Sequence, residues 1–270
     1  MNRKLLALAS ATVAIAALAP LAQAQTAAPA PAPAPAEASP LSLNIGAVTE
    51  YRYRGISQTR FKPALQGGAD YAFSSGFYVG TWLSTIKWIK DAGQIAAVDV
   101  GSANVEWDLY GGYKGEIVKD LAYDVGVLAY VYPGNHYDNI PGAKKADTVE
   151  IYGALTYGPA TLKYSHAVTD TFANFDSKGS FYVDLSATFD VAGVSIVPHV
   201  GYQKIKGPFE DPGSYTDYSL TVSKEVVKGL SLSAAAVGTD ADKAFYVSPK
   251  NGKELGKPTL VLGAKYTYNF

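Results

Sequence analysis

The last segment of the chain, residues 260–270, alternates apolar and polar positions with a period of two. The intervening positions carry mainly small or polar side chains. A period of two is typical of a β-strand with one apolar face, because successive side chains on a strand point to opposite sides. The apolar positions are Leu260, Leu262, Ala264, Tyr266, Tyr268 and Phe270.

The same alternation recurs upstream in a series of short runs, and no helical period of comparable length competes with it. We therefore predict about twelve strands, with ten or fourteen still open if one run has been split or merged. The length of the chain suits that number at roughly 9–11 residues a strand. The runs lie at 41–53, 65–73, 77–88, 105–114, 121–131, 149–157, 161–168, 181–189, 194–203, 217–222, 230–237 and 260–270.

Short turns and longer polar segments alternate between these runs. This alternation is typical of an antiparallel up-and-down barrel in an outer membrane, with tight periplasmic turns and longer extracellular loops. It also predicts that both ends of the barrel segment are periplasmic and that the first and last strands pair. The short turns are at 74–76, 115–120, 158–159, 190–193 and 227–229, and the longer segments at 55–63, 89–103, 133–147, 170–179, 206–214 and 239–258.

The N-terminal residues 1–24 have the pattern of a secretion signal. Arg3 and Lys4 precede an apolar run, and a small-x-small cleavage site ends at Ala24. The alternative, a membrane anchor, is disfavoured because a spanning helix needs about 20 apolar residues. Residues 25–40 are rich in Ala and Pro and predict an extended periplasmic tether, with partner binding as the alternative. The barrel is expected to occupy residues 41–270.

Three aromatic residues near the C-terminus, Tyr266, Tyr268 and Phe270, suit an aromatic girdle at a membrane surface. They also form the C-terminal insertion signal that we expect the barrel-assembly machinery to bind. The expected surroundings of the barrel are outer-membrane lipid and lipopolysaccharide, and its expected localisation is the bacterial outer membrane. The oligomeric state is left open, since lateral contacts would be apolar in a monomer and in a trimer alike.

The composition excludes several classes of function. The net charge is −1 and there is no basic stripe, so we expect no nucleic-acid partner. Cysteine is absent, which excludes disulfides and thiolate metal sites, and three scattered histidines are too few for a metal cage. We therefore expect neither a metal nor another cofactor.

Catalysis is not expected either. The nearest candidates for a nucleophile and its base are Ser165 beside His166 and Ser195 beside His199. We set both pairs aside because neighbouring strand residues point to opposite faces and so cannot share a proton.

The polar positions of the runs should point into the barrel. Among them acidic residues outnumber basic ones, which predicts a mixed, mildly acidic lining with weak ionic preference. A barrel of this size lies between one filled by side chains and one with an aqueous channel, so a narrow pore and a plugged lumen both remain open. The predicted inward residues are Glu50, Asp70, Glu106, Asp108, Asp124, Glu150, Asp184 and Asp217, against Arg52, Arg54, Lys114, Lys163 and Lys265.

The sequence Tyr-Arg-Tyr-Arg at 51–54 is the most distinctive local feature. Alternation directs both tyrosines toward lipid and both arginines inward, near the outer mouth of the first strand. One interpretation is a cationic constriction that favours anions. The other is that Arg52 and Arg54 pair with lumen carboxylates such as Glu50 or Asp70, because an arginine in a narrow polar lumen usually needs a counterion.

Three nearby segments carry a resemblance to a known family. They are EYRYRGISQ at 50–58, PALQGGADY at 63–71 and SGFYVGTW at 75–82, and the pattern continues in WDLYGGY at 107–113. They resemble the N-terminal part of the TorF porin family, most closely over residues 43–82. The resemblance implies an outer-membrane barrel that conducts small solutes.

Two functions follow as expectations. The first is an outer-membrane channel that passes small hydrophilic solutes through a narrow polar lumen. The alternative is a barrel with a closed lumen, whose outer loops bind a ligand or partner or which strengthens the envelope. The near balance of opposite charges in the predicted lining motivates the alternative, because such charges can cross-link into a plug.

Overall fold

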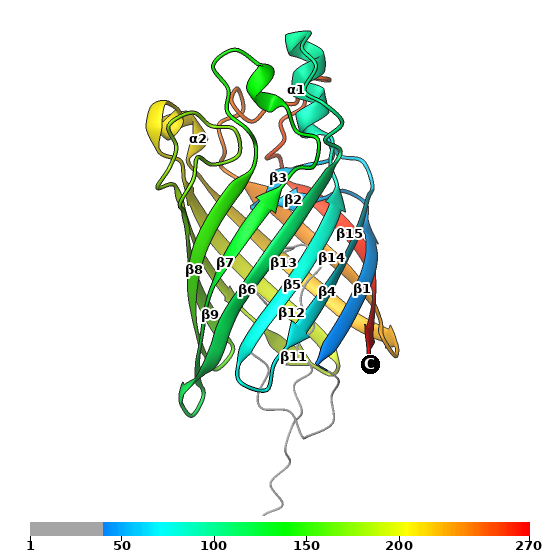
Figure 1. The fold of residues 1–270 in the computed structure, drawn as a ribbon. Coiled ribbons are helices and arrows are strands. Elements are labelled where there is room, and N and C mark those ends of the chain that lie inside the picture. Colours follow the sequence, from blue (N-terminus) through cyan, green and yellow to red (C-terminus); the bar gives the residue numbers. More distant parts are fainter. Residues whose placement is uncertain (1–39) are drawn as a thin grey trace, which may run out of the picture.

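The computed structural model describes residues 40–270. The expected secretion signal and nearly all of the expected tether lie outside the described residues. Within residues 40–270 the chain forms a closed antiparallel barrel of twelve strands, as the alternation predicts (Figure 1). No helix of this part of the chain has the length and apolar character needed to cross a membrane.

Each barrel strand pairs with its neighbours in sequence, and the barrel closes where β1 meets β15. Seven residue pairs, from Ser42 opposite Asn269 to Val48 opposite Gly263, join these two strands. The strand that follows β9 is interrupted at Thr188, so that β10 and β11 both pair with β12. The barrel strands are β1 (Leu41–Val48), β4 (Ala64–Ala72), β5 (Phe77–Thr85), β6 (Val105–Val118), β7 (Leu121–Val131), β8 (Thr148–Tyr157), β9 (Ala160–Ala167), β10 (Phe181–Ala187), β11 (Phe189–Val191), β12 (Val194–Lys204), β13 (Tyr215–Val227), β14 (Leu230–Thr239) and β15 (Thr259–Asn269).

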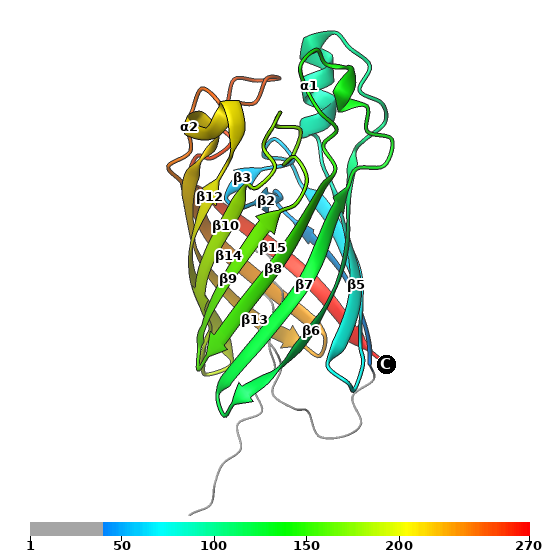
Figure 2. The same cartoon turned by 60° about the vertical axis from the view of Figure 1, so that its left-hand side comes forward.

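The connections separate by length. The long connections lie at one end of the barrel, which we call the loop end. The short connections and the C-terminus lie at the opposite end, which we call the turn end (Figures 1 and 2). Three predicted turns are shorter than expected, because β6 continues to Val118, β11 to Val191 and β13 to Val227. Two-residue turns remain, at 119–120, 192–193 and 228–229. The long connections contain the helices α1 (Trp88–Ala96), η1 (Tyr137–Asn139), η2 (Gly207–Phe209) and α2 (Glu210–Gly213).

The outer surface of the barrel is apolar. On β13, Tyr218, Leu220 and Val222 are 50%, 49% and 39% exposed, whereas Asp217 and Thr221, at the alternate positions of the same strand, are buried inside. Apolar residues exposed in this alternating way suit lipid, since a barrel that hydrogen-bonds all its strands leaves only side chains to meet the membrane. Tyr266, Tyr268 and Phe270 belong to this outer surface and are 45%, 50% and 58% exposed.

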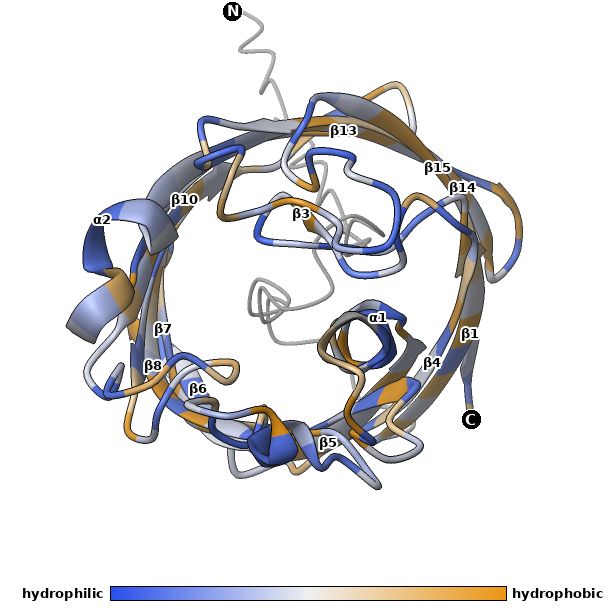
Figure 3. Cartoon of the chain, turned by 90° about the horizontal axis from the view of Figure 1, so that it is seen from above, coloured by the Kyte–Doolittle hydropathy of each residue, from blue (hydrophilic) through white to orange (hydrophobic). Residues whose placement is uncertain are grey.

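The first long connection folds into the barrel. Residues 49–63, here called the inner hairpin, contain the two short strands β2 (Arg52–Tyr53) and β3 (Ile56–Ser57), which pair with each other and with no barrel strand. Seen along the barrel axis, β3 lies inside the ring of strands (Figure 3). The predicted first strand, 41–53, is therefore too long, because the strand in the wall ends at Val48.

The tip of the inner hairpin is a two-residue turn formed by Arg54 and Gly55, with φ angles of +45° and +78°. Positive φ at both central residues is the type I′ geometry that suits a tight β-hairpin, and Asn-Gly or Gly-Gly normally form it. A non-glycine residue in the left-handed region costs about 1–2 kcal/mol. Arginine is thus present at the tip despite its backbone conformation, which indicates that its side chain has a role there.

Candidate functional site

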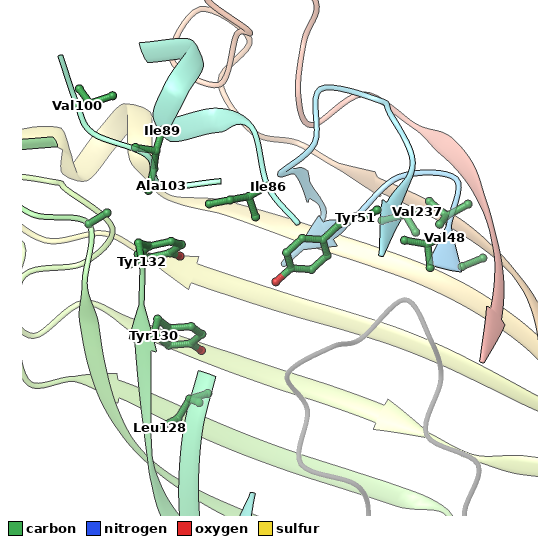
Figure 4. Close-up of a cluster of buried hydrophobic side chains, with 14 of the residues drawn as sticks. Val48, Tyr51, Ile86, Ile89, Val100, Ala103, Leu128, Tyr130, Tyr132 and Val237 are labelled. Atoms are coloured by element: carbon green, nitrogen blue, oxygen red, sulfur yellow. The ribbon is translucent and has the colours of Figure 1, made fainter. Parts of the chain in front are cut away.

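The inner hairpin extends from β1 across the lumen, and its aromatic residues contact the wall on one side. The Tyr51 hydroxyl donates a hydrogen bond to Glu106 Oε1 at 2.5 Å, and Tyr132 donates to Glu106 Oε2 at 2.9 Å. The Tyr51 ring meets Trp82 of β5 edge-on, with the ring centroids 5.3 Å apart. Tyr51, Tyr130 and Tyr132 converge here from the hairpin and from β7 with its following residue (Figure 4).

Tyr53 continues this contact toward β7. Its hydroxyl donates to the Tyr130 hydroxyl at 3.1 Å, and its ring packs against Tyr130 and Phe172. Both hairpin tyrosines are therefore inside the barrel, and the prediction that they face lipid is wrong. The strand alternation was correct, but it applies to a hairpin in the lumen, where both faces meet protein.

Arg54 reaches the far side of the lumen. Its Nη1 donates to Gln203 Oε1 at 2.6 Å, and its Nη2 donates to Glu150 Oε2 at 2.7 Å. The guanidinium carbon lies 4.3 Å from the Tyr182 ring centroid and 4.8 Å from that of Tyr53. We call Glu150, Gln203 and Tyr182 the wall cage, because β8, β12 and β10 supply these three contacts to Arg54.

The charge of Arg54 is secured by its surroundings. The pKa of Arg54 is raised above its ordinary value, because Glu150, Tyr53 and Tyr130 outweigh the burial that by itself lowers it. A buried guanidinium requires such a partner, since an unpaired buried charge is strongly destabilising.

Arg52 secures the base of the inner hairpin. Its Nη2 lies 2.7 Å from Glu50 Oε1, and its Nη1 donates to the carbonyl oxygens of Gly55 and Leu255 at 2.7 and 2.8 Å. Its Nη2 also donates to Thr259 Oγ1 of β15 at 2.8 Å. The interpretation of the arginines as ion-paired therefore matches the contacts of both, although Asp70 is not their partner. Neither arginine is on a wall strand, which corrects their predicted place on the first strand.

The remaining side of the inner hairpin packs against the last loop. Ile56 lies in an apolar cluster with Tyr215, Tyr246 and Leu255, and the Ser57 amide donates to the Leu255 carbonyl at 3.0 Å. The hairpin thus contacts barrel strands around the whole ring. These are β5, β6, β7, β8, β10, β12, β13 and β15.

An ion pair links the inner hairpin to α1. Arg60 Nε lies 2.9 Å from Asp91 Oδ2. Burial raises the pKa of Asp91 above its ordinary value, and Arg60, Lys250 and Lys87 only partly offset this. The cost of desolvating the ionised carboxyl is therefore larger than the favourable interaction with the nearby cations.

The predicted inward residues of the wall lie inside the barrel, in two groups. Toward the loop end, Glu106, Asp108, Glu150, Asp184 and Asp217 are all at most 2% exposed. Toward the turn end, Asp70 accepts a hydrogen bond from Tyr110 at 2.5 Å, and Asp124 accepts one from Tyr78 at 2.6 Å.

Lys114 and Lys265 accompany the second group, whereas Lys163 lies between the two groups, opposite Asp184 of β10. Lys163 lies over the Tyr152 ring, with Nζ 4.1 Å from the centroid, and Lys114 lies over the Tyr78 ring at 5.4 Å. Lys265 lies on the inward side of β15 opposite Gly46 of β1. Acidic and basic side chains are therefore interleaved with tyrosines on the inner side of the wall.

His199 lies among acids rather than beside a serine. Its Nε2 is 2.6 Å from Asp184 Oδ2, its Nδ1 is 3.6 Å from Asp217 Oδ1, and Tyr182 is within hydrogen-bond distance at 3.1 Å. Contrary to the prediction, Ser195 and His199 do not point to opposite faces, because they are four residues apart on β12 and both point inward. That separation along a strand is about 13 Å, which prevents proton transfer between them.

Sequence reasoning missed the aromatic and amide partners of Arg54 on the wall, namely Tyr182 and Gln203. One signal for the hairpin itself is present in the sequence. Arg54-Gly55 lies between two short pairs of strand-forming residues, and a dipeptide ending in Gly in that setting indicates a two-residue turn. The partners of Arg54 carry no comparable signal, since they are separated from it by 96 and 149 residues.

The architecture and the site together define the class of protein. A closed antiparallel barrel with an apolar outer surface, a polar interior and a loop folded into its lumen has the β-barrel architecture of outer-membrane porins. The chain belongs to the family Gcw_chp, described as a bacterial protein of unknown function, whose family model matches residues 32–268.

Solved porin structures are similar to this fold. The KdgM porin has a TM-score of 0.52 at 8% identity, covering 84% of this chain and 99% of its own. The KdgM porin in complex with disordered oligogalacturonate gives 0.52 at 7% identity, with 84% and 99% covered. The NanC porin gives 0.52 at 8% identity, with 85% and 100% covered. The likeness at these identities concerns the fold. No curated protein matches the sequence.

Proposed function

We propose that this chain is an outer-membrane channel of the TorF porin type, which passes small hydrophilic solutes through a narrow polar lumen. The observation that carries the proposal is the division of side chains on the strands, with apolar residues outside and small or polar residues inside, and with buried ionisable residues among the inward ones on most strands. An interior filled for stability alone would be apolar, because burying ionisable groups is costly. The fold shared with KdgM and NanC supports the same proposal.

The inner hairpin would set the permeability of this channel. It is the segment that crosses the lumen, and Arg54 at its tip contacts the opposite wall. A loop folded into a barrel determines the width and the charge that a passing solute meets. The wall acids at this level outnumber the bases, so we expect the channel to prefer cations and neutral solutes.

The ligand in one of the KdgM structures is an oligogalacturonate, an acidic oligosaccharide. An acidic solute would require a positively charged lining, whereas the lining of this barrel carries mainly acidic residues. Glu106, Asp108, Glu150, Asp184 and Asp217 surround the hairpin, and their negative charge would repel a polyanion. We therefore propose that acidic oligosaccharides are poor solutes for this chain.

The experiment is single-channel recording in planar bilayers. Refolded protein that runs as a folded barrel should give discrete current steps in KCl, and a variant lacking residues 51–60 should give larger steps. Folded protein that gives no steps, either with or without the hairpin, would exclude the channel.

The alternative is a barrel with a closed lumen that acts through its outer loops. One observation favours it, namely that the inner hairpin contacts strands around the whole ring. The two functions differ in the hairpin deletion. A channel held shut by its hairpin conducts once the hairpin is removed, whereas a barrel whose interior is closed throughout remains silent and would show a ligand effect on its melting temperature alone.

A further inference from the structure

The wall cage holds the guanidinium of Arg54 as a binding site holds a ligand. A carboxylate, an amide oxygen and the face of an aromatic ring all contact the same group, from Glu150, Gln203 and Tyr182. Each is a favoured partner of a guanidinium, through charge-assisted hydrogen bonds and cation–π contact. The hairpin contributes only Tyr53, so most of the site belongs to the wall.

The wall cage is oriented by bonds that do not involve the hairpin. Gln203 Nε2 donates to the Phe181 carbonyl at 3.1 Å, which directs its Oε1 toward the lumen. The Tyr182 hydroxyl donates to Asp217 Oδ2 at 2.8 Å, and Tyr130 donates to Glu150 Oε2 at 3.1 Å. The three groups would therefore keep their positions if Arg54 left.

Small side chains leave room for a ligand between the members of the wall cage. Tyr182 is paired directly with Gln203 across β10 and β12, and with Ser165 across β9. On the other side of β9, Glu150 is paired with Ala167. Ser165 and Ala167 are thus the inward residues between Glu150 and Tyr182, and they are too short to occupy the space that the guanidinium fills.

The charge around the wall cage would favour a cation in place of Arg54. Besides Glu150, the carboxylates of Asp184 and Asp217 are buried close by, with Lys163 as the neighbouring base. Asp184 Oδ1 meets no hydrogen-bond donor within residues 40–270. Without Arg54 the acids of this region outnumber its bases, whether or not His199 is protonated.

We propose that the wall cage is a recognition site for small solutes that carry a guanidinium or a primary ammonium group, and that Arg54 occupies it as an internal mimic of the solute. This inference rests on the proposed channel function. A cationic solute that enters from the loop end competes with Arg54 for Glu150, Gln203 and Tyr182. Binding of the solute releases the tip of the inner hairpin and opens the path through the lumen.

The test compares two solutes that differ in one group. Arginine carries the guanidinium, and citrulline replaces it with a neutral urea of nearly the same size. Uptake of each into proteoliposomes containing the folded protein is measured as a ratio of initial rates. We expect arginine to enter on the order of tenfold faster, since hydrogen bonds to charged groups have about that effect on binding.

Variants distinguish the role of Arg54, the internal mimic, from that of the wall cage. Glu150→Gln should reduce the ratio to near one, and Gln203→Met, which keeps the side-chain length, should lower it as well. Arg54→Ala should speed the uptake of both solutes while arginine remains preferred, because the wall cage is intact. Glu210→Gln makes the same change as Glu150→Gln in an exposed side chain of α2 and should leave the ratio unchanged. Heat-dependent gel mobility confirms that each variant is folded.

The outcomes distinguish the two proposals. Equal uptake of arginine and citrulline by the unaltered protein overturns the recognition site and leaves the channel in place. Retention of the arginine preference in folded Glu150→Gln also overturns it. Absence of uptake of either solute in both the unaltered protein and Arg54→Ala overturns the channel, and the recognition site with it.

Discussion

Arg54 Nη2 and Glu150 Oε2 lie 2.7 Å apart, although the two residues are separated by 96 positions in the chain. The first belongs to a hairpin that begins at β1, and the second to β8 on the other side of the barrel. This contact turns a surface loop into a crossing of the lumen. In the proposed channel, this contact would set the charge that a solute meets at the inner hairpin.

Replacing Arg54 should change ionic selectivity. Arg54→Ala removes the positive charge at the tip of the inner hairpin and leaves Glu150 without its cation, so the reversal potential in a KCl gradient should shift toward cation selectivity. Arg54→Lys keeps the charge but loses the forked contact with Gln203 and Glu150. Its reversal potential should therefore lie between that of the unaltered protein and that of Arg54→Ala. An unchanged reversal potential in Arg54→Ala would show that ions bypass the tip.

Replacing Arg52 should detach the hairpin rather than change selectivity. Arg52→Met leaves Glu50 buried without its cation, which should weaken docking of the hairpin by about 3–5 kcal/mol. Hydrogen exchange of the Gln58 amide, which donates to the Tyr51 carbonyl at 2.8 Å, reports this change. The double variant Arg52→Met with Glu50→Gln should recover much of the protection, and equal exchange in the single and double variants would contradict this account.

The hairpin turn should tolerate no side chain at Gly55. A Cβ there would lie 2.3 Å from Thr239 Cγ2 and 2.8 Å from Asp217 Cβ, at a φ of +78°. Gly55→Ala should therefore displace the tip and give larger, noisier current steps. Gly142→Ala is the matched control, because Gly142 has a φ of +80° but nothing within 4 Å of its Cβ position. Its backbone strain is similar, and its conductance should be unchanged.

The outer surface should reject charge. Leu220 is 49% exposed on β13, and Leu220→Arg should lower the free energy of unfolding in lipid vesicles by about 2–4 kcal/mol if the residue lies near the bilayer midplane. Ser233→Arg, an inward position on β14, should cost much less because its charge can reach the polar lumen. Equal losses in urea-unfolding experiments would contradict the assignment of the lipid surface.

The ion pair between Arg60 and Asp91 should have an unusual dependence on pH. Because the pKa of folded Asp91 is raised, the native loop binds the proton more tightly than the unfolded chain does. This contribution to stability is fully present below the pKa of Asp91 in the unfolded chain. It is lost as the pH rises through the higher pKa of Asp91 in the folded protein. Asp91→Asn cannot ionise, so its melting temperature relative to the unaltered protein should rise from pH 3 to pH 7. A fall over that range would show that the ion pair outweighs the desolvation.

The sequence alone was sufficient to predict the barrel. Strand alternation, as on β13 and β15, follows from the need to place apolar groups in lipid and polar groups inside, and that requirement acts on each strand separately. The alternation of short turns and long loops likewise predicted which connections would gather at each end. These properties are local, so a single sequence contains them.

The place of the inner hairpin was decided by the tertiary structure. Tyr51, Arg52, Tyr53 and Arg54 continue the alternation of β1, and a period of two is the same for a strand in the wall and for a hairpin in the lumen. What distinguishes them is the set of partners that receives the side chains, namely Glu106, Tyr130, Glu150 and Gln203. Those residues come together only when the barrel closes, because hydrogen bonds and ion pairs depend on distances in space that the order of residues along the chain does not contain.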